Sequence, residues 1–240
     1  MKKSANKILL ILTLGLLIIA DSVGKSTAFV DSEETSELID GVSAANWTIF
    51  SPSLAEDMES VDFKSVRKFS EEYGTDERLI LALMKQESQF DENAVSYRGA
   101  RGLMQIMPVT NLELVEELDL PKSSLPRENI QAGIYYFSKL YRLFKTGTKG
   151  DRIRLALAAY NAGPSRIYDA QDLAAYLGEN PNEWRSIRNV LPLLSKRYYS
   201  LHGAVWSASR PPAGYFGSWR ETSSYVDAVM KTYKGYRSGK

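Results

Sequence analysis

The sequence contains no cysteine and a single histidine, His202. Without cysteine the chain has no disulfide bonds, no thiol nucleophile, no cysteine-ligated metal and no lipid-modified cysteine. One histidine in an irregular stretch leaves a histidine-based triad and a histidine-rich zinc site without their other members. The segment 99–102 lacks the Gly-Lys-Ser/Thr ending of a phosphate-binding loop. We therefore expect no metal, no cofactor and no nucleic-acid partner.

The apolar run near the N-terminus is too short for an ordinary membrane span. Residues 8–20 carry no charge and follow Lys2, Lys3 and Lys7, whereas a bilayer span needs roughly 20 apolar residues. This pattern is typical of a signal-peptide core, with a short membrane anchor as the second interpretation. The sequence predicts that residues 1–28 are this signal or anchor, and that the protein is exported to the periplasm or cell envelope.

Charge and periodicity divide the rest of the chain in two. Residues 21–60 hold nine acids and one lysine without a sustained helical period, so we predict a flexible acidic tether over 29–60. From residue 61 to 240 apolar residues recur three and four positions apart, and strand-like alternation is nearly absent, which predicts one all-α domain. The expected helices span 61–73, 76–90, 103–107, 109–118, 128–146, 151–162, 164–177, 182–200 and 222–235. This body carries a modest excess of basic residues, which suits an anionic polymer.

One acid lies where an apolar residue would be expected. On the predicted helix 76–90, Glu87 shares a face with Ile80, Leu83, Met84 and Phe90. Burial raises the pKa of a carboxyl group, so the group can hold a proton near neutral pH and serve as a general acid. A structural glutamate paired with an arginine, or capping a backbone group, would occupy the same position.

Two further segments carry polar groups beside glycines. Residues 99–108 read GARGLMQIMP, in which two glycines permit close backbone approach before a short apolar helix. Residues 158–164 read AAYNAGP, in which a tyrosine and an asparagine stand at a helix end before a glycine. A tyrosine ring packs against a sugar face, and an asparagine both donates to and accepts from an N-acetyl group. A turn with a core helix is the competing interpretation of the first segment, and a plain helix–turn–helix corner is that of the second.

The ordered set of motifs resembles a known family. ESQF at 87–90, GLMQIMP at 102–108, AAYNAGP at 158–164 and ETSSYV at 221–226 are similar to the four motifs of the soluble-type lytic transglycosylases, glycoside hydrolase family 23. The resemblance covers about residues 60–235, and the segment 182–199 is further similar to the catalytic domain of the membrane-bound type F branch. It implies a goose-lysozyme-like α-helical fold with a substrate groove, and cleavage of the glycan strands of bacterial peptidoglycan.

The resemblance also implies roles for individual residues. Glu87 would act first as the acid and then as the base. The residues that match the family's substrate-binding positions are Ser96, Gln105, Met107, Tyr160, Asn161, Glu221 and Tyr225. Ser96 would line the cleavage site, and Gln105 and Met107 would form its floor. Tyr160 and Asn161 would contact sugar rings and acetamido groups. Glu221 and Tyr225 would close the groove. Aromatic residues at helical spacing, such as Tyr136, are assigned to the core.

The spacing of acids bears on the reaction. Hydrolysis of a glycoside usually needs two carboxyl groups, yet after Asp91 and Glu92 no acid occurs between residues 93 and 112. This favours a route with one carboxylate, in which the muramyl 6-hydroxyl closes on C1 and forms a 1,6-anhydro product. A lysozyme-type hydrolase that uses Asp91, Glu92 or Glu221 is a second hypothesis, and a non-catalytic wall-binding module is a third. The expected partners are glycan strands and cell-wall machinery that the sequence does not identify.

Overall fold

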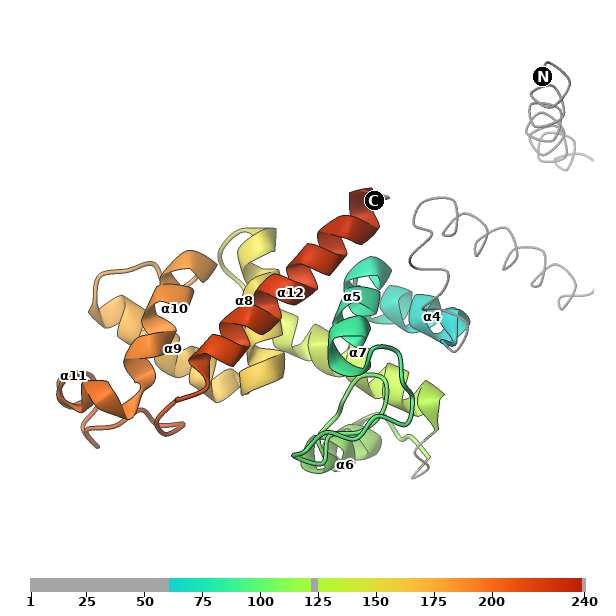
Figure 1. The fold of residues 1–240 in the computed structure, drawn as a ribbon, viewed down its shortest axis with the longest axis horizontal. Coiled ribbons are helices and arrows are strands. Elements are labelled where there is room, and N and C mark those ends of the chain that lie inside the picture. The colour runs from blue at the N-terminus through green and yellow to red at the C-terminus, as the bar shows by residue number, and fades with distance from the viewer. Residues whose placement is uncertain (1–60, 122–124, 239–240) are drawn as a thin grey trace, which may run out of the picture. The chain divides into compact units, whose positions relative to one another are not determined.

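The computed structural model describes residues 61–121 and 125–238 (Figure 1). The signal or anchor predicted at 1–28 and the tether predicted at 29–60 lie outside the described residues. Within the described ranges, no helix combines the length and the apolarity that a bilayer crossing requires.

The described chain is helical, which confirms the all-α prediction. The β-type pairing in the described residues consists of two isolated antiparallel bridges, Val95 with Arg101 and Arg101 with Ile106. The elements are α4 (Phe63–Tyr73), α5 (Glu77–Ser88), α6 (Pro108–Glu117), α7 (Pro126–Leu143), α8 (Lys149–Ala162), α9 (Pro164–Tyr176), α10 (Trp184–Val190), the 3-10 turns η1 (Leu191–Leu194) and η2 (Lys196–Tyr198), α11 (Tyr199–Val205) and α12 (Trp219–Ser238).

Local sequence explains where the helices around the site begin and end. The Asp76 carboxylate accepts a hydrogen bond from the backbone N–H of Arg78 at 3.0 Å, which satisfies one of the free donors at the start of α5. Between α8 and α9 the backbone turns at Gly163, whose φ is 88°, and Pro164 begins the next helix. Proline suits the first helical position and glycine suits the helix end, so this junction is predictable from the sequence.

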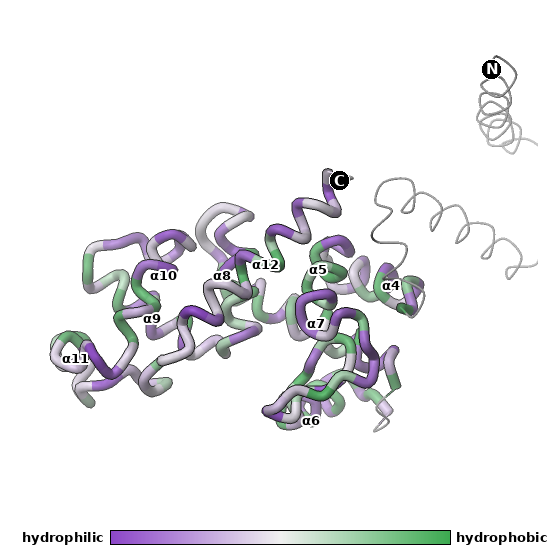
Figure 2. The backbone as a smooth tube through the Cα atoms, in the orientation of Figure 1, coloured by the Kyte–Doolittle hydropathy of each residue, from purple (hydrophilic) through white to green (hydrophobic). Residues whose placement is uncertain are grey.

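The core sits where α5 packs against α4 and α12, while α8 contacts α7, α9 and α12. The predicted inward face of α5 is buried: Ile80, Leu83 and Met84 have no exposed surface, and Phe90 is buried just beyond the helix. Burying each such side chain contributes about 1.5–3 kcal/mol. Figure 2 shows the resulting hydrophobic stretches in α5. The packing holds the last turn of α5, which carries Glu87, against α12.

The helix predicted at 103–107 does not form. Residues 102–105 make turns instead, and the backbone of Gln105 has a φ of 46°. Arg101 and Ile106 exchange both N–H···O=C bonds, each at 3.1 Å, so the backbone groups that a helix would use are already paired across the turn. This segment is a loop held by these hydrogen bonds, and its apolar side chains Leu103 and Met104 are buried in the core.

The single helix predicted at 182–200 is broken into α10, η1, η2 and the start of α11. The break follows Val190 and coincides with Pro192, which has no N–H to donate and whose ring clashes with a carbonyl in the preceding turn. The stretch 201–221, which shows little periodicity in sequence, contains the end of α11 and the first turn of α12.

Candidate active site

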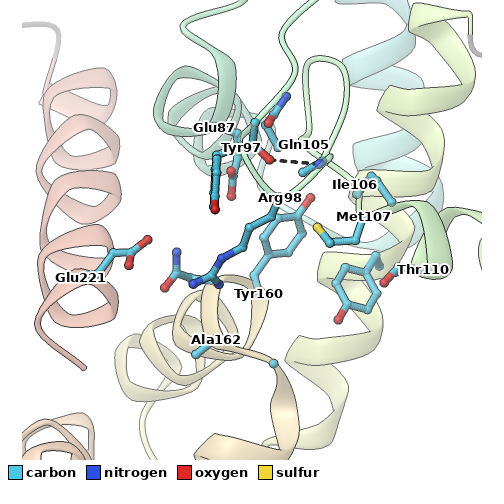
Figure 3. Close-up of a pocket in the computed structure, with 15 residues that line it drawn as sticks. Glu87, Tyr97, Arg98, Gln105, Ile106, Met107, Thr110, Tyr160, Ala162 and Glu221 are labelled. Carbon is cyan, nitrogen blue, oxygen red and sulfur yellow. Dashed lines mark hydrogen bonds between the residues drawn. The ribbon is translucent and has the colours of Figure 1, made fainter. Parts of the chain in front are cut away.

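One pocket of about 610 Å³ gathers most of the predicted site residues (Figure 3). The predicted residues that line it are Glu87, Ser96, Gln105, Met107, Tyr160, Asn161 and Glu221. They come from the end of α5, the loop before α6, the end of α8 and the first turn of α12. Tyr225 is not among the lining residues, but its hydroxyl donates a hydrogen bond to Glu87. The structure brings all eight together, and their roles remain predictions.

Glu87 is held in a partly buried position that changes its acidity. Burial of the carboxyl group raises the pKa of Glu87 from 4.5 to about 7, because the charged form loses solvation, while the hydrogen bond from Tyr225 lowers that pKa by stabilising the charged form. The first effect is the larger one. Among the described residues, no arginine or lysine contributes to this pKa. The alternative drawn from the sequence, a structural glutamate in an ion pair with an arginine, is therefore not supported.

Two tyrosines beside Glu87 remain uncharged donors. Burial raises the pKa of both Tyr160 and Tyr225 well above 10, and the nearby Glu87 carboxylate raises it further. The Tyr160 hydroxyl donates to the carbonyl of Met104 at 2.7 Å, and its ring packs against Tyr136 with centroids 5.4 Å apart. The hydroxyl hydrogen bond and the tilted contact with the Tyr136 ring together hold the Tyr160 ring in place at the pocket.

Ser96 and Gln105 shape the loop that forms one wall of the pocket. The Ser96 hydroxyl oxygen accepts a hydrogen bond from the backbone N–H of Ala100 at 2.9 Å. The Gln105 amide donates to the carbonyls of Ala94 at 3.0 Å and Gly102 at 2.9 Å. Both side chains therefore hold backbone in place, and the Ser96 O–H and the Gln105 carbonyl oxygen are left for a ligand.

Helix α7 anchors the same loop from behind. The Asn129 side chain accepts from the Met104 N–H at 2.8 Å and donates to the Arg101 carbonyl at 3.0 Å. Two glycines permit this contact: a Cβ on Gly102 would lie 2.6 Å from the Asn129 side chain, and a Cβ on Gly133 would lie 2.4 Å from Met104. Because Met104 carries the carbonyl that Tyr160 binds, the α7 contact also positions the pocket.

Helix α12 closes the opposite side of the pocket. The Thr222 hydroxyl donates to Oδ1 of Asn161 at 2.7 Å, which orients the amide and leaves its N–H groups available as donors. Glu221, one residue earlier in the first turn of α12, is exposed and extends toward the pocket in Figure 3. Met107 is 41% exposed and stands at the start of α6.

Four of the lining residues with polar or aromatic side chains were not predicted from the sequence: Tyr97, Arg98, Thr110 and Tyr136. Helical spacing assigns Tyr136 to the core, but it is partly exposed and faces both Tyr160 and the pocket. Tyr97 and Arg98 lie between Ser96 and Gly99, so a turn at this glycine is the sequence feature that could have placed them beside Ser96 in the pocket. Nothing in the local sequence marks Thr110.

The acids considered for a second carboxylate separate into two groups. Asp91 accepts a hydrogen bond from the N–H of Asn93 at 2.8 Å and Glu92 lines a different pocket, and neither is among the residues that line the pocket of Glu87. Glu221 lines the same pocket as Glu87. Among the described residues, the pocket therefore combines one proton-holding carboxyl group, one exposed carboxylate, amide groups and aromatic rings.

Replacing Tyr225 with phenylalanine should raise the pKa of Glu87 above its present value of about 7, because a donor to the charged form is removed. We expect the alkaline limb of the activity profile to move to higher pH and kcat to fall about tenfold, as the carboxyl group loses its orientation. Tyr233→Phe is the matched control, since Tyr233 on the same helix donates to Asp76 instead. An unchanged or acid-shifted limb in Tyr225→Phe would contradict this assignment.

Comparisons with known proteins identify the family that part of the chain matches. The family model described as the transglycosylase SLT domain matches residues 64–181. The chain is 38% identical over 135 residues to the membrane-bound lytic murein transglycosylase F of Desulfosudis oleivorans, covering 56% of this chain and 29% of the relative. It is 42% identical over 166 residues to the membrane-bound lytic murein transglycosylase F 1 of Alkalilimnicola ehrlichii, covering 69% of this chain and 31% of the relative.

A solved structure of an inactive mutant of the lytic transglycosylase Slt from Pseudomonas aeruginosa is 27% identical, covers 76% of this chain and 25% of that chain, and superposes with a TM-score of 0.49. The chain spans less than a third of the length of the two curated relatives. The family match and the relatives confirm the resemblance drawn from the four motifs. Residues 64–181 of the chain belong to the transglycosylase SLT domain family.

Proposed function

We propose that this protein is a peptidoglycan lytic transglycosylase that cleaves the β-1,4 bond between N-acetylmuramic acid and N-acetylglucosamine without water. The observation that carries the proposal is Glu87, a carboxyl group with a pKa of about 7 at a pocket lined by Tyr160 and Asn161. The names of the curated relatives, lytic murein transglycosylases, support the same substrate.

The proposed reaction uses Glu87 alone to move the proton. Protonated Glu87 donates its proton to the bridging oxygen as the bond from that oxygen to C1 of the muramyl residue breaks, and the substrate's acetamido group stabilises the positive charge at C1. The Glu87 carboxylate then takes the proton of the muramyl 6-hydroxyl, whose oxygen bonds to C1. The proton returns to Glu87, no water is consumed, and the product carries a 1,6-anhydro ring.

Mass spectrometry of digested peptidoglycan tests the proposal. We expect muropeptides that end in 1,6-anhydro-muramic acid from the parent protein and none from Glu87→Gln. Reducing-end products about 18 Da heavier, the mass of one added water, would overturn the transglycosylase reaction. Equal release of soluble glycan by the parent and by Glu87→Gln would instead support a non-catalytic wall-binding module.

Hydrolysis is the second candidate function, and the observation that favours it is the position of Glu221 in the pocket. A hydrolase needs a second carboxylate to activate water or to attack C1. If Glu221 has that role, Glu221→Gln should abolish activity as completely as Glu87→Gln. In the transglycosylase route Glu221→Gln retains anhydro product, because the 6-hydroxyl replaces water and Glu87 alone moves the proton.

The pKa of Glu87 predicts the pH dependence of the reaction. The carboxyl group must be protonated to donate, so the rate should be highest below about pH 7 and should fall roughly tenfold per pH unit above it. Initial rates of anhydro-end formation between about pH 5 and pH 9 would measure this limb. A rate that rises through pH 7 would show that the ionised form starts the reaction.

The proposed substrate places the protein in the cell envelope, in agreement with the names of its membrane-bound relatives. We propose that residues 8–20 direct export or anchor the protein at the inner membrane, and that wall-spanning machinery recruits it. Fractionation of cells that express the full chain and a chain without residues 1–28 would test the first part, because loss of the apolar run should leave the protein in the cytoplasm.

A further inference from the structure

A hydrogen-bonded turn presents two side chains at the rim of the active-site pocket. The N–H of Gly99 donates to the carbonyl of Ser96 at 2.9 Å, so Tyr97 and Arg98 are the two central residues of the turn. The N–H of Ser96 donates to the carbonyl of Ala100 at 2.9 Å, and the N–H of Ala100 donates to the Ser96 hydroxyl. The backbone at the tip is therefore fixed by three hydrogen bonds, and it projects both side chains outward.

The Arg98 guanidinium at this tip is exposed and faces the pocket (Figure 3). Within residues 61–121 and 125–238, no carboxylate or other acceptor pairs with it. Glu221 lines the same pocket but forms no ion pair with Arg98. Tyr160, which lines the same pocket, stays uncharged because burial raises its pKa well above 10. Arg98 is thus an exposed cation on a hydrogen-bonded turn at the wall of the pocket.

The proposed substrate carries an anion that suits this cation. Each muramyl residue bears a lactyl ether that ends in a carboxyl group, which is free in strands without peptide and is amide-linked to a carboxylate-bearing peptide in strands with peptide. A planar guanidinium donates two parallel N–H groups to a carboxylate, a geometry that an ammonium group does not reproduce. Neutral N-acetylglucosamine offers no such anion.

We propose that Arg98 binds a carboxylate of the muramyl arm, and so selects muramyl-containing strands over uncharged glycans of the same backbone. The inference rests on the proposed function for its substrate class. The carboxylate comes either from the lactyl group or from the peptide stem, and the two differ in the strands that display them.

Binding to matched strands tests this inference without turnover. The protein would carry Glu87→Gln so that strands stay intact, with Arg98→Gln, Arg98→Lys or no further change. The ligands are denuded glycan strands with free lactyl carboxylates, the same strands with every carboxyl converted to a methylamide, and strands that retain their peptides. Arg101→Gln is the control, because Arg101 lies on the same loop but lines a different pocket.

We expect Arg98→Gln to weaken binding to carboxylate-bearing strands about fivefold to tenfold at low salt, with Arg98→Lys intermediate. Added salt should reduce the difference, because the pair is exposed. Binding to methylamide strands should be unaffected by either change, and Arg101→Gln should bind every strand like the parent. An effect confined to denuded strands identifies the lactyl carboxylate, and one confined to peptide-bearing strands identifies the stem.

Equal weakening on methylamide strands would overturn the inference and would favour a contact between Arg98 and Glu221 or a neutral sugar group. Two further results would overturn it: unchanged binding of carboxylate-bearing strands in Arg98→Gln, or no binding of the denuded or the peptide-bearing strands by the parent. The proposed function fails by a separate observation, the absence of anhydro ends from the parent protein. Retention of anhydro product together with an Arg98-independent affinity overturns only the role of Arg98.

Discussion

Replacing Glu87 with glutamine should lower kcat/KM for peptidoglycan by at least about 10²- to 10⁴-fold. Glutamine keeps the size and the acceptor oxygen of the side chain, but it neither donates a proton to the glycosidic oxygen nor removes one from the 6-hydroxyl. The measurement is the initial rate of anhydro-end formation at about pH 6, where the parent carboxyl group is protonated. A loss below about tenfold would place the acid elsewhere.

Unfolding measurements separate this chemical loss from a structural one. The folded-state pKa of Glu87 lies above its ordinary value of 4.5, so the folded protein holds more protons than the unfolded chain between 4.5 and about 7. The contribution of Glu87 to stability is therefore lost as pH rises through that window. At about pH 8 the Glu87→Gln variant should be as stable as the parent or more stable, by up to the order of 2 kcal/mol, since it buries no charge. A less stable variant would indicate a structural glutamate.

Replacing Gly133 with alanine should destabilise the protein by about 1–3 kcal/mol, although alanine favours a helix by about 0.5–1 kcal/mol over glycine. The added Cβ would lie 2.4 Å from Met104 Cβ and 2.5 Å from its Cγ, inside the buried contact between α7 and the active-site loop. Because the Met104 carbonyl binds the Tyr160 hydroxyl, activity should fall along with the free energy of unfolding.

Gly203→Ala is the matched control for this change. Gly203 also lies within a helix, but its added Cβ would lie 3.5 Å from the Ser209 hydroxyl, which is an ordinary contact. The variant should gain up to about 0.5–1 kcal/mol from helix propensity. Equal effects of the two substitutions in denaturant unfolding would show that the contact with Met104 is not what requires glycine at residue 133.

Much of the helical architecture could be predicted from periodicity. The two predicted helices that do not form as expected each have a local cause. The inward face of α5 was predictable because a helix returns to the same face every three to four residues, and Gly163 with Pro164 marks a helix junction. The helix expected at 103–107 failed because apolar spacing does not reveal that Arg101 pairs with Ile106. The helix expected at 182–200 is interrupted near Pro192, because proline has no N–H to donate and its ring clashes with the preceding turn.

The candidate site divides in a similar way. Seven of its lining residues were proposed from the resemblance to the family, in segments that lie far apart in the chain, while Tyr136 and Thr110 were missed. A helical tyrosine that faces a cavity and one that faces the core have the same spacing in sequence. Only the contact between α7 and α8 decides which of the two Tyr136 is.

By itself the sequence determined the helical class, the family and the acid on an apolar face, because residue type and spacing are local properties of the chain. The tertiary structure decided the pKa of that acid and which residues contact it. The pKa of Glu87 near 7 requires the burial that α5 and α12 create together, with Tyr225 joined to it across 138 positions of sequence. Desolvation depends on every neighbour in space, so it appears only when the chain has folded.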